Sequence, residues 1–377
     1  MHLNRLTLNN FRSYENLDLS FNPGTTTFIG DNGSGKTNIA EAIIYLSQLS
    51  SHRVSTNQPL IHLGSEQAII KAVIKKENRV LEIDLEINAK KNNRAQINGN
   101  PTRSQREILG ACQTIYFSPE DLDLVRGDPS QRRSFMDQLL VTRNPRLAGV
   151  LTDYDRVVKQ RNALLKTRAA QSALTPWNEQ LALIGANLTA KRIDLCEELN
   201  PFVHQNYKTL NETKPASINY KSTIDNLTTN VEKNIEIYNE NIQQLQYQEI
   251  ERGVTLVGPH RDDLHLQIGD FPAKGYASHG ESWSMALSLK LGAFSLLREE
   301  GSEPILILDD VFAELDATRR THLMNATQVA EQTIITAAVE EDLPEGLPTD
   351  RRYIEPGKVL ERKSLSLIHI SEPTRPY

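Results

Sequence analysis

The chain of 377 residues is long enough for more than one hydrophobic core, and we expect two domains. A formal net charge of −6 and a pI of about 5.9 argue against a uniformly basic nucleic-acid binder, although a net charge hides local patches. No apolar run reaches the length of about 18 residues that a membrane span needs, so we expect no membrane partner. The N-terminus lacks an export signal core, which predicts a cytoplasmic protein. The chain has two cysteines, Cys112 and Cys196, which lie far apart in the sequence, so we expect no disulfide.

The first elements of the chain predict a nucleotide-binding strand, loop and helix. Apolar residues indicate strands over residues 3–8 and 17–21, and a β-branched run indicates a third over residues 25–29. Residues 30–37, Gly-Asp-Asn-Gly-Ser-Gly-Lys-Thr, then fit the pattern G-x-x-x-x-G-K-[ST] of the phosphate-binding P-loop. Apolar residues at helical spacing follow, namely Ile39, Ala42, Ile43, Leu46 and Leu49.

This loop has the composition that phosphate binding requires. Its glycines can take backbone angles that turn successive N–H groups toward a phosphate, and the start of the helix adds its positive dipole end. Lys36 is expected to reach the β- and γ-phosphates, and the Thr37 hydroxyl to bind Mg²⁺. The predicted cofactor-binding residues are Gly30, Asp31, Asn32, Gly33, Ser34, Gly35, Lys36 and Thr37. The alternative, a chance glycine-rich turn, is disfavoured by the flanking strand and helix.

Residues 69–97 change to a pattern typical of antiparallel strands. From Leu81 to Ile87, apolar residues alternate with acidic ones, which predicts a half-buried strand. Residues 75–78 are expected to turn this strand back from a preceding one over residues 68–74, and Asn98-Gly99 marks a further hairpin. We therefore expect an antiparallel β layer beside the nucleotide-binding sheet.

Residues 125–250 are predicted to form an inserted helical arm. Helices are expected over residues 130–168, from Pro176 to about residue 200 with Thr175 as the cap, and over residues 231–250. Pro201 and Pro215 are expected to break or kink the stretch between the last two. Residues 130–168 hold nine Lys and Arg side chains against three Asp side chains, a net charge of +6.

Strand patterns return after the arm and predict the second half of the site. They cover residues 255–268 and 333–336, and the apolar run at 305–310 predicts a strand buried on both faces in a parallel sheet. Beside a P-loop this run has the form of a Walker B strand. Asp309 is then expected to hold the Mg²⁺ shell, and Asp310 to polarise the water that attacks the γ-phosphate. The alternative for both carboxylates is a helix cap or a turn.

Residues 278–282, Ser-His-Gly-Glu-Ser, precede an apolar helical run at 285–297. They predict a second phosphate nest, with the Ser278 hydroxyl and the Gly280 N–H as donors. Because this nest duplicates the P-loop within one subunit, we expect it to close on the nucleotide of another subunit. A simple helix N-cap is the alternative. Residues 314–316, Glu-Leu-Asp, form a fourth motif, for which a solvated helix start is the alternative.

The order and spacing of these motifs resemble the ABC-type ATPase head and, more narrowly, the RecF family of recombination mediators. The resemblance covers about residues 1–360 and rests on LNNFRSY at 8–14, GDNGSGKTN at 30–38, SHR at 51–53, FSPEDL at 117–122, GPHRDDL at 258–264 and DDVFAELD at 309–316. It implies an α/β P-loop ATPase head, with a mixed sheet and an antiparallel β layer, plus an inserted α-helical arm. The head would comprise residues 1–124 and 251–360, the arm residues 125–250, and residues 361–377 a tail foreign to the family, whose sequence from Ser364 resembles translated vector sequence and favours disorder.

The resemblance also implies an ATP-controlled DNA clamp. Such proteins form homodimers on ATP, bind duplex DNA near single-strand gaps and act with RecR and RecO to load recombinase, in gap repair and replication restart. Slow, Mg²⁺-dependent ATP hydrolysis ends the bound state. On this reading the +6 segment contacts DNA phosphates through Arg132, Arg133, Arg143 and Arg146, whereas a solvated helical face is the alternative.

Three positions depart from the pattern of ABC-type heads. Glu281 and Asp310 replace a usual Gln and a usual catalytic Glu, and only Glu120 lies where a Mg²⁺-contacting Gln is common. The shorter reach of Asp310 fits slow hydrolysis. Two rival functions stay open: an SMC-type tethering ATPase, which needs a coiled coil far longer than an insert of roughly 125 residues, and a P-loop kinase, which has no need for residues 278–282.

Overall fold

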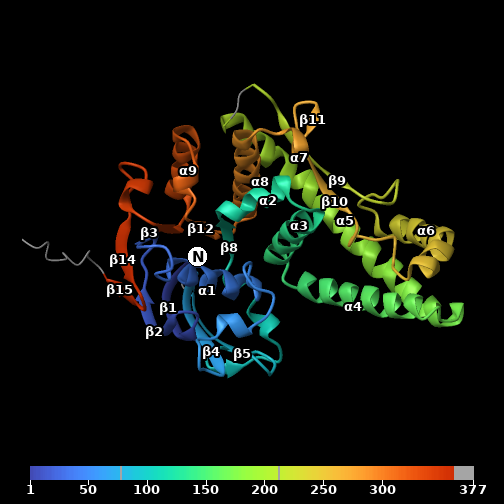
Figure 1. The fold of residues 1–377 in the computed structure, drawn as a ribbon, viewed down its shortest axis with the longest axis horizontal. Coiled ribbons are helices and arrows are strands. Elements are labelled where there is room, and N and C mark those ends of the chain that lie inside the picture. Colours follow the sequence, from blue (N-terminus) through green and yellow to red (C-terminus); the bar gives the residue numbers. More distant parts are fainter. Residues whose placement is uncertain (77–78, 211–212, 361–377) are drawn as a thin grey trace, which may run out of the picture.

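A mostly parallel sheet forms the centre of the molecule (Figure 1). In the computed structural model, which describes residues 1–76, 79–210 and 213–360, its strand order is β15-β14-β3-β13-β12-β8, and only β15 runs antiparallel to its neighbour. The predicted tail at 361–377 lies outside the described residues. The strands are β3 (Gly24–Ile29), β8 (Thr114–Phe117), β12 (Ile305–Asp309), β13 (Gln332–Ala337), β14 (Asp350–Glu355) and β15 (Lys358–Leu360).

Strand β12 confirms the prediction of a strand buried on both faces. Ile305 and Ile307 belong to one hydrophobic core, and Leu306 and Leu308 belong to the other. Successive side chains of a strand point to opposite faces, so an apolar run without alternation requires cover on both. Because β3, β12 and β13 are parallel, their carboxyl ends meet at one edge of the sheet, and the P-loop and the two carboxylates follow there.

The predicted antiparallel layer is confirmed as a second six-stranded sheet, with the order β2-β1-β4-β5-β6-β7. Its strands are β1 (His2–Phe11), β2 (Tyr14–Ser20), β4 (Gln67–Lys76), β5 (Arg79–Asn88), β6 (Arg94–Ile97) and β7 (Asn100–Pro101). The Asn98-Gly99 turn joins β6 to β7 with positive φ at both residues. The predicted turn at 75–78 lies partly outside the described residues. Helix α1 (Lys36–Gln48) shares one core with both sheets and thereby holds the two layers together.

The arm extends away from the sheets as helices packed around a small sheet (Figure 1). It contains α2 (Asp123–Arg126), α3 (Pro129–Arg143), α4 (Leu147–Lys166), α5 (Gln171–Leu210), β9 (Ala216–Lys221) and α6 (Val231–Arg252). The chain continues through β10 (Asp263–Ile268), β11 (Phe271–Pro272), α7 (Ala273–Tyr276), α8 (His279–Glu299) and α9 (Ala317–Val329). Short 3₁₀ helices are Gln58–Leu60, Gln105–Ile108, Pro119–Leu122, Phe312–Glu314 and Glu340–Asp342.

One hydrophobic core runs from the arm helices through α8 to the parallel sheet. The predicted domain boundaries near residues 124 and 250 therefore stay predictions, because no break in this core marks them. Over the described ranges, no helix combines the length and the hydropathy that crossing a bilayer demands. Cys112 and Cys196 are both buried and free.

Helix α5 starts earlier than predicted, and it is not broken at Pro201. It begins at Gln171 rather than after a Thr175 cap, and it continues through Pro201 to Leu210. A proline inside a helix removes one backbone hydrogen bond and costs about 3 kcal/mol in isolation. Here α8 packs so closely that a Cβ on Gly292 would lie 3.2 Å from Val203. This contact, two residues beyond Pro201, holds the helical path that local preference disfavours.

The predicted strand over residues 255–262 is wrong, since β10 begins only at Asp263. Gly258 has a φ of 124°, and a Cβ there would lie 2.3 Å from the Tyr154 hydroxyl. Pro259 lacks the N–H that a strand ladder uses. The apolar residues before it therefore fill the arm core from a loop.

A buried ion pair joins two helices of the arm. The side chains of Arg161 on α4 and Glu249 on α6 are both fully buried and paired. Arg161 also donates to Asn178 Oδ1 at 2.8 Å and to Thr255 Oγ1 at 3.0 Å, and Glu249 Oε1 accepts the Leu256 N–H at 2.7 Å. Each charge thus depends on the other for its burial.

Replacing Arg161 with Met should lower the free energy of unfolding by about 3–5 kcal/mol, because Glu249 keeps a buried and uncompensated charge. Denaturant unfolding followed by circular dichroism measures this. Arg156→Met is the matched control, since the Arg156–Asp153 pair is exposed, and its effect should stay below about 1 kcal/mol. Equal effects for the two variants would contradict this account of the pair.

Candidate functional site

The predicted P-loop joins the end of β3 to the start of α1. Gly33 and Gly35 have φ values of 83° and 113°, in the left-handed region that favours glycine. Gly30 is needed for a different reason, because a Cβ there would lie 2.4 Å from the carbonyl oxygen of Ile354 on β14. The loop therefore packs against β14 at Gly30, and the positive φ values of Gly33 and Gly35 direct the backbone into α1.

The Lys36 ammonium group is buried against the loop that surrounds it. Its Nζ donates to the carbonyl oxygens of Gly30 at 2.8 Å and Asp31 at 3.4 Å, and lies 3.9 Å from Asp310 Oδ1. Ser34 Oγ and Asp310 Oδ1 are buried without a hydrogen-bond partner among the described residues. Buried polar atoms normally have partners, so these unpaired atoms are suited to a polar ligand held in the loop.

The Walker B carboxylates reach the loop from the end of β12, which β13 separates from β3. Asp309 Oδ1 accepts hydrogen bonds from Thr37 Oγ1 at 3.2 Å and from Thr336 Oγ1 at 2.6 Å. Asp310 follows in a left-handed conformation with φ 52°, and its N–H donates to Thr336 Oγ1 at 3.0 Å. The structure thus brings together Lys36, Thr37, Asp309 and Asp310.

These groups fit a magnesium ion. Burial raises the pKa of Asp309 and of Asp310 above the ordinary range, because a carboxylate loses hydration there; Lys36 opposes the effect at Asp310. A cation between them would favour the ionised forms. A hydroxyl and a carboxylate oxygen, as Thr37 and Asp309 supply, are hard ligands of the kind that Mg²⁺ prefers.

The loop tip is open to solvent. Asp31, Asn32 and Gly33 are exposed, whereas Ser34, Gly35 and Lys36 are buried. A ligand can therefore approach over the tip and reach the buried ammonium beneath it. The roles predicted for the individual loop residues stay predictions.

The signature motif begins helix α8 with a capping box. Ser278 Oγ accepts the Glu281 N–H at 3.2 Å, and the Glu281 carboxylate accepts the Ser278 N–H at 2.9 Å. The N-cap geometry that sequence offered as an alternative is therefore present. No hydrogen bond or ion pair links residues 278–282 to residues 30–37 within the described parts of the chain. The expectation that Ser278 and Gly280 act on another subunit's nucleotide stays a prediction.

Arg319 connects the signature motif to the motif after Walker B, a link that sequence reasoning missed. Its guanidinium pairs with Asp316 and donates to Ser284 Oγ at 3.0 Å and to the Gly280 carbonyl at 2.7 Å. Asp316 also caps α9, as the alternative for that motif proposed. The available signal was a basic residue three positions after Asp316, within the helix start that was the alternative for that motif.

Sequence reasoning also missed two residues whose hydroxyl groups hydrogen-bond to the Asp309 carboxylate, Thr336 and Tyr116. Thr336 lies one residue before the end of β13 and Tyr116 one residue before the end of β8, and both strands are parallel neighbours of β12. The rule that parallel strands end at one edge could have identified Thr336 from the run at 333–336. Strand β8 is short and ends beside FSPEDL, so the pattern gave no register for Tyr116.

Three of the nine basic side chains of residues 130–168 pair with carboxylates from outside that segment, namely Arg132, Arg143 and Arg161. The side chain of Arg132 is buried and donates to both Asp263 oxygens, at 2.7 and 2.9 Å, which argues against the DNA contact predicted for it. Arg143 pairs with Glu198 and Glu300, so its charge already has partners within the chain. Arg146 is exposed and Arg133 is half-buried, so the prediction stays open for these two.

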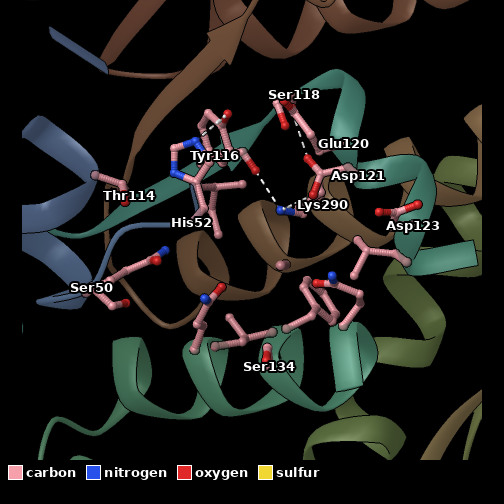
Figure 2. A pocket seen from close by; sticks show the side chains of 18 of the residues that line it. Ser50, His52, Thr114, Tyr116, Ser118, Glu120, Asp121, Asp123, Ser134 and Lys290 are labelled. Carbon is pink, nitrogen blue, oxygen red and sulfur yellow. Dashed lines mark hydrogen bonds and ion pairs between the residues drawn. The ribbon is translucent and has the colours of Figure 1, made fainter. Parts of the chain in front are cut away.

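A polar cavity of about 700 Å³ lies beside β8 (Figure 2). His52, Glu120, Asp121 and Lys290 are among the residues that line it, and Lys290 Nζ lies 2.8 Å from Asp121 Oδ1. Glu120 thus belongs to the wall of this cavity. Its predicted contact with Mg²⁺ stays a prediction.

Comparison with known sequences relates the chain to one family. Residues 2–349 match the family model described as the RecF/RecN/SMC N terminal domain. The chain is 48% identical over 383 residues to the DNA replication and repair protein RecF of Rhodococcus erythropolis, with 94% of each chain covered. It is 46% identical over 370 residues to the protein of the same name from Streptomyces avermitilis, covering 95% of this chain and 99% of that one.

Solved structures give the same relationship. The structure of the recombination mediator protein RecF-ATPrS in the RecFOR pathway matches with a TM-score of 0.88 at 27% identity, covering 95% of this chain and 97% of that one. An SMC head bound to the C-winged helix domain of ScpA matches with a TM-score of 0.57 at 15% identity, which shows a shared fold alone. These matches confirm the predicted fold class, an ABC-type ATPase head.

Substituting Gly30 with Ala should lower the free energy of unfolding by about 1–3 kcal/mol, because the added methyl group must displace β14 or the loop. Chemical denaturation measures the change. Gly149→Ala is the control: this residue lies on α4 with no atom within 4 Å of the added Cβ, and the change should be neutral or stabilising by up to about 1 kcal/mol. A Gly30 variant as stable as the native chain would show that the contact with Ile354 is not a constraint.

Proposed function

We propose, from the premise that this chain belongs to the RecF family of DNA replication and repair proteins, that it is a DNA-binding protein which ATP converts into a homodimer. One observation carries the proposal: a buried Lys36, the Thr37 hydroxyl and two carboxylates converge at one sheet edge. This set matches the needs of a nucleoside triphosphate with Mg²⁺. The similar RecF structures are named for bound ATP and ATPrS, which supports ATP as the nucleotide.

Each residue of the site has a proposed role. The backbone N–H groups of residues 30–37 hold the phosphates, and Lys36 exchanges its bonds to loop carbonyls for the β- and γ-phosphates. Thr37 and Asp309 would hold Mg²⁺, which when bound neutralises the charge that develops on the phosphates. Asp310 positions the attacking water, and its short side chain fits slow turnover, a switch rather than a metabolic reaction.

The second half of the site comes from a partner molecule. Ser278 and Gly280 lie at the N-terminus of the 21-residue helix α8, where the N–H groups of the first turn and the helix dipole favour an anion. Two chains arranged head to head would each place this terminus on the nucleotide of the other. ATP is then the link between subunits, and its hydrolysis releases them.

The biological setting follows from the family. We place the protein in the cytoplasm, on duplex DNA near single-strand gaps, where it acts with RecR and RecO in recombinational repair and replication restart. The SMC-type alternative needs long coiled-coil helices, whereas α4, α5 and α6 pack into one shared core. A P-loop kinase has no use for a signature motif before Walker B.

Replacing Ser278 with Arg should abolish ATP-dependent dimerisation and leave ATP binding by the monomer largely intact, because the nest acts on the other subunit's nucleotide. Light scattering with and without ATP, beside a fluorescent nucleotide titration, separates the two effects. Ser104→Arg removes a similar capping box at Gln105–Ile108, remote from the site, and serves as the control. A Ser278 variant that still dimerises on ATP would refute the nest in trans.

Reversing the charge of Arg133 and Arg146 should weaken DNA binding at every sequence and reduce the salt slope by about one per lost phosphate contact. Fluorescence anisotropy at several salt concentrations measures both quantities. Arg5→Glu combined with Lys71→Glu, at two exposed ion-paired residues of the antiparallel sheet, controls for the same change in net charge. Unchanged affinity and slope would assign these side chains to a solvated helical face.

A further inference from the structure

Tyr116 joins Asp309 to the cavity through its hydroxyl group. The hydroxyl lies 3.4 Å from Asp309 Oδ2 and 3.0 Å from His52 Nε2. Tyr116 is 8% exposed, whereas His52 is exposed on the cavity wall, where its ring packs against the tyrosine ring at 4.4 Å. Figure 2 shows the two side chains next to each other.

The sheet places Tyr116 where it can act on Asp309. Tyr116 pairs with Ile307 across the parallel strands β8 and β12, and Asp309 lies two residues further along the same face. Diagonal neighbours of this kind are within reach of a long aromatic side chain. Lys290 holds the backbone of Tyr116, because its Nζ donates to the Tyr116 carbonyl oxygen at 2.8 Å.

The hydrogen bonds have one consistent direction. Asp309 Oδ1 already accepts from Thr37 and Thr336, so Oδ2 is the oxygen that Tyr116 orients. A phenol has one proton, and when it donates to the carboxylate, its oxygen can only accept from His52. The series of hydrogen bonds therefore runs from His52 Nε2–H to the Tyr116 hydroxyl, and from that hydroxyl to the Asp309 carboxylate.

We infer that Tyr116, supported by His52, is a positioning residue that fixes the Asp309 carboxylate for Mg²⁺. This rests on the proposed function, in which Asp309 holds the metal. Residues that orient a metal-binding carboxylate commonly change metal affinity or activity by about 10–100-fold when removed. His52 belongs to the motif SHR, to which the proposed mechanism otherwise gives no role.

The test is binding of a fluorescent ATP analogue titrated with MgCl₂. For Tyr116→Phe, the half-saturating Mg²⁺ concentration should rise about tenfold, while nucleotide binding in EDTA stays as in the native chain. Tyr45→Phe is the matched control: it also removes a buried hydroxyl, which is bonded to Asn57 and Asn93 outside the site. The control should titrate as the native chain does.

Two variants of His52 test the same hydrogen bonds without changing Tyr116 or the packing around its ring. His52→Leu removes the donor and should shift the Mg²⁺ titration in the same direction, whereas His52→Gln keeps an N–H at a similar reach and should restore it. A Tyr116→Phe titration that coincides with the native one overturns the inference, as do two His52 variants that behave alike. A native chain that binds no nucleotide refutes the proposed function itself, and the inference with it.

Discussion

The carboxylate of Asp309 is the point at which four separate segments of the chain meet. Thr37 reaches it from the P-loop helix, Thr336 from β13 and Tyr116 from β8, while Asp309 itself ends β12. The parallel sheet brings the ends of these strands to one edge, and α1 between the two sheets fixes the loop against that edge. A change in register of β12 would separate the carboxylate from all three hydroxyl groups at once.

The two hydrophobic cores explain why this edge is rigid. Each face of β12 packs against a different core, one with α1 and the antiparallel sheet and one with α8 and the arm. Helix α8 begins with the signature motif and contains Lys290 further along. It also contacts α5 at Gly292. Movement of the arm would reach the signature motif through this helix, and also through the direct contacts Lys214–Glu281 and Arg126–Ser282.

The sequence predicted the elements with local signals and missed those decided by packing. The P-loop, β12 and the antiparallel layer follow from short patterns whose physical cause is local. Helix α5 passes through Pro201 because α8 packs there, and the stretch at 255–262 is a loop because Gly258 must approach Tyr154. A local pattern contains neither contact.

The candidate site divides in the same way. Lys36, Thr37, Asp309 and Asp310 were found because motif spacing encodes them. Tyr116 and Arg319 were missed because their partners lie on other elements. The net charge of +6 omits the partner of Arg132, since its compensating Asp263 lies outside the counted segment.

The central claim is that ATP joins two copies of this chain on DNA. Sedimentation velocity of the protein with a gapped duplex, with and without ATP and Mg²⁺, tests it most directly. A DNA-bound species with the mass of two chains should form only with ATP. A DNA-bound monomer whose sedimentation is the same with and without ATP would contradict it.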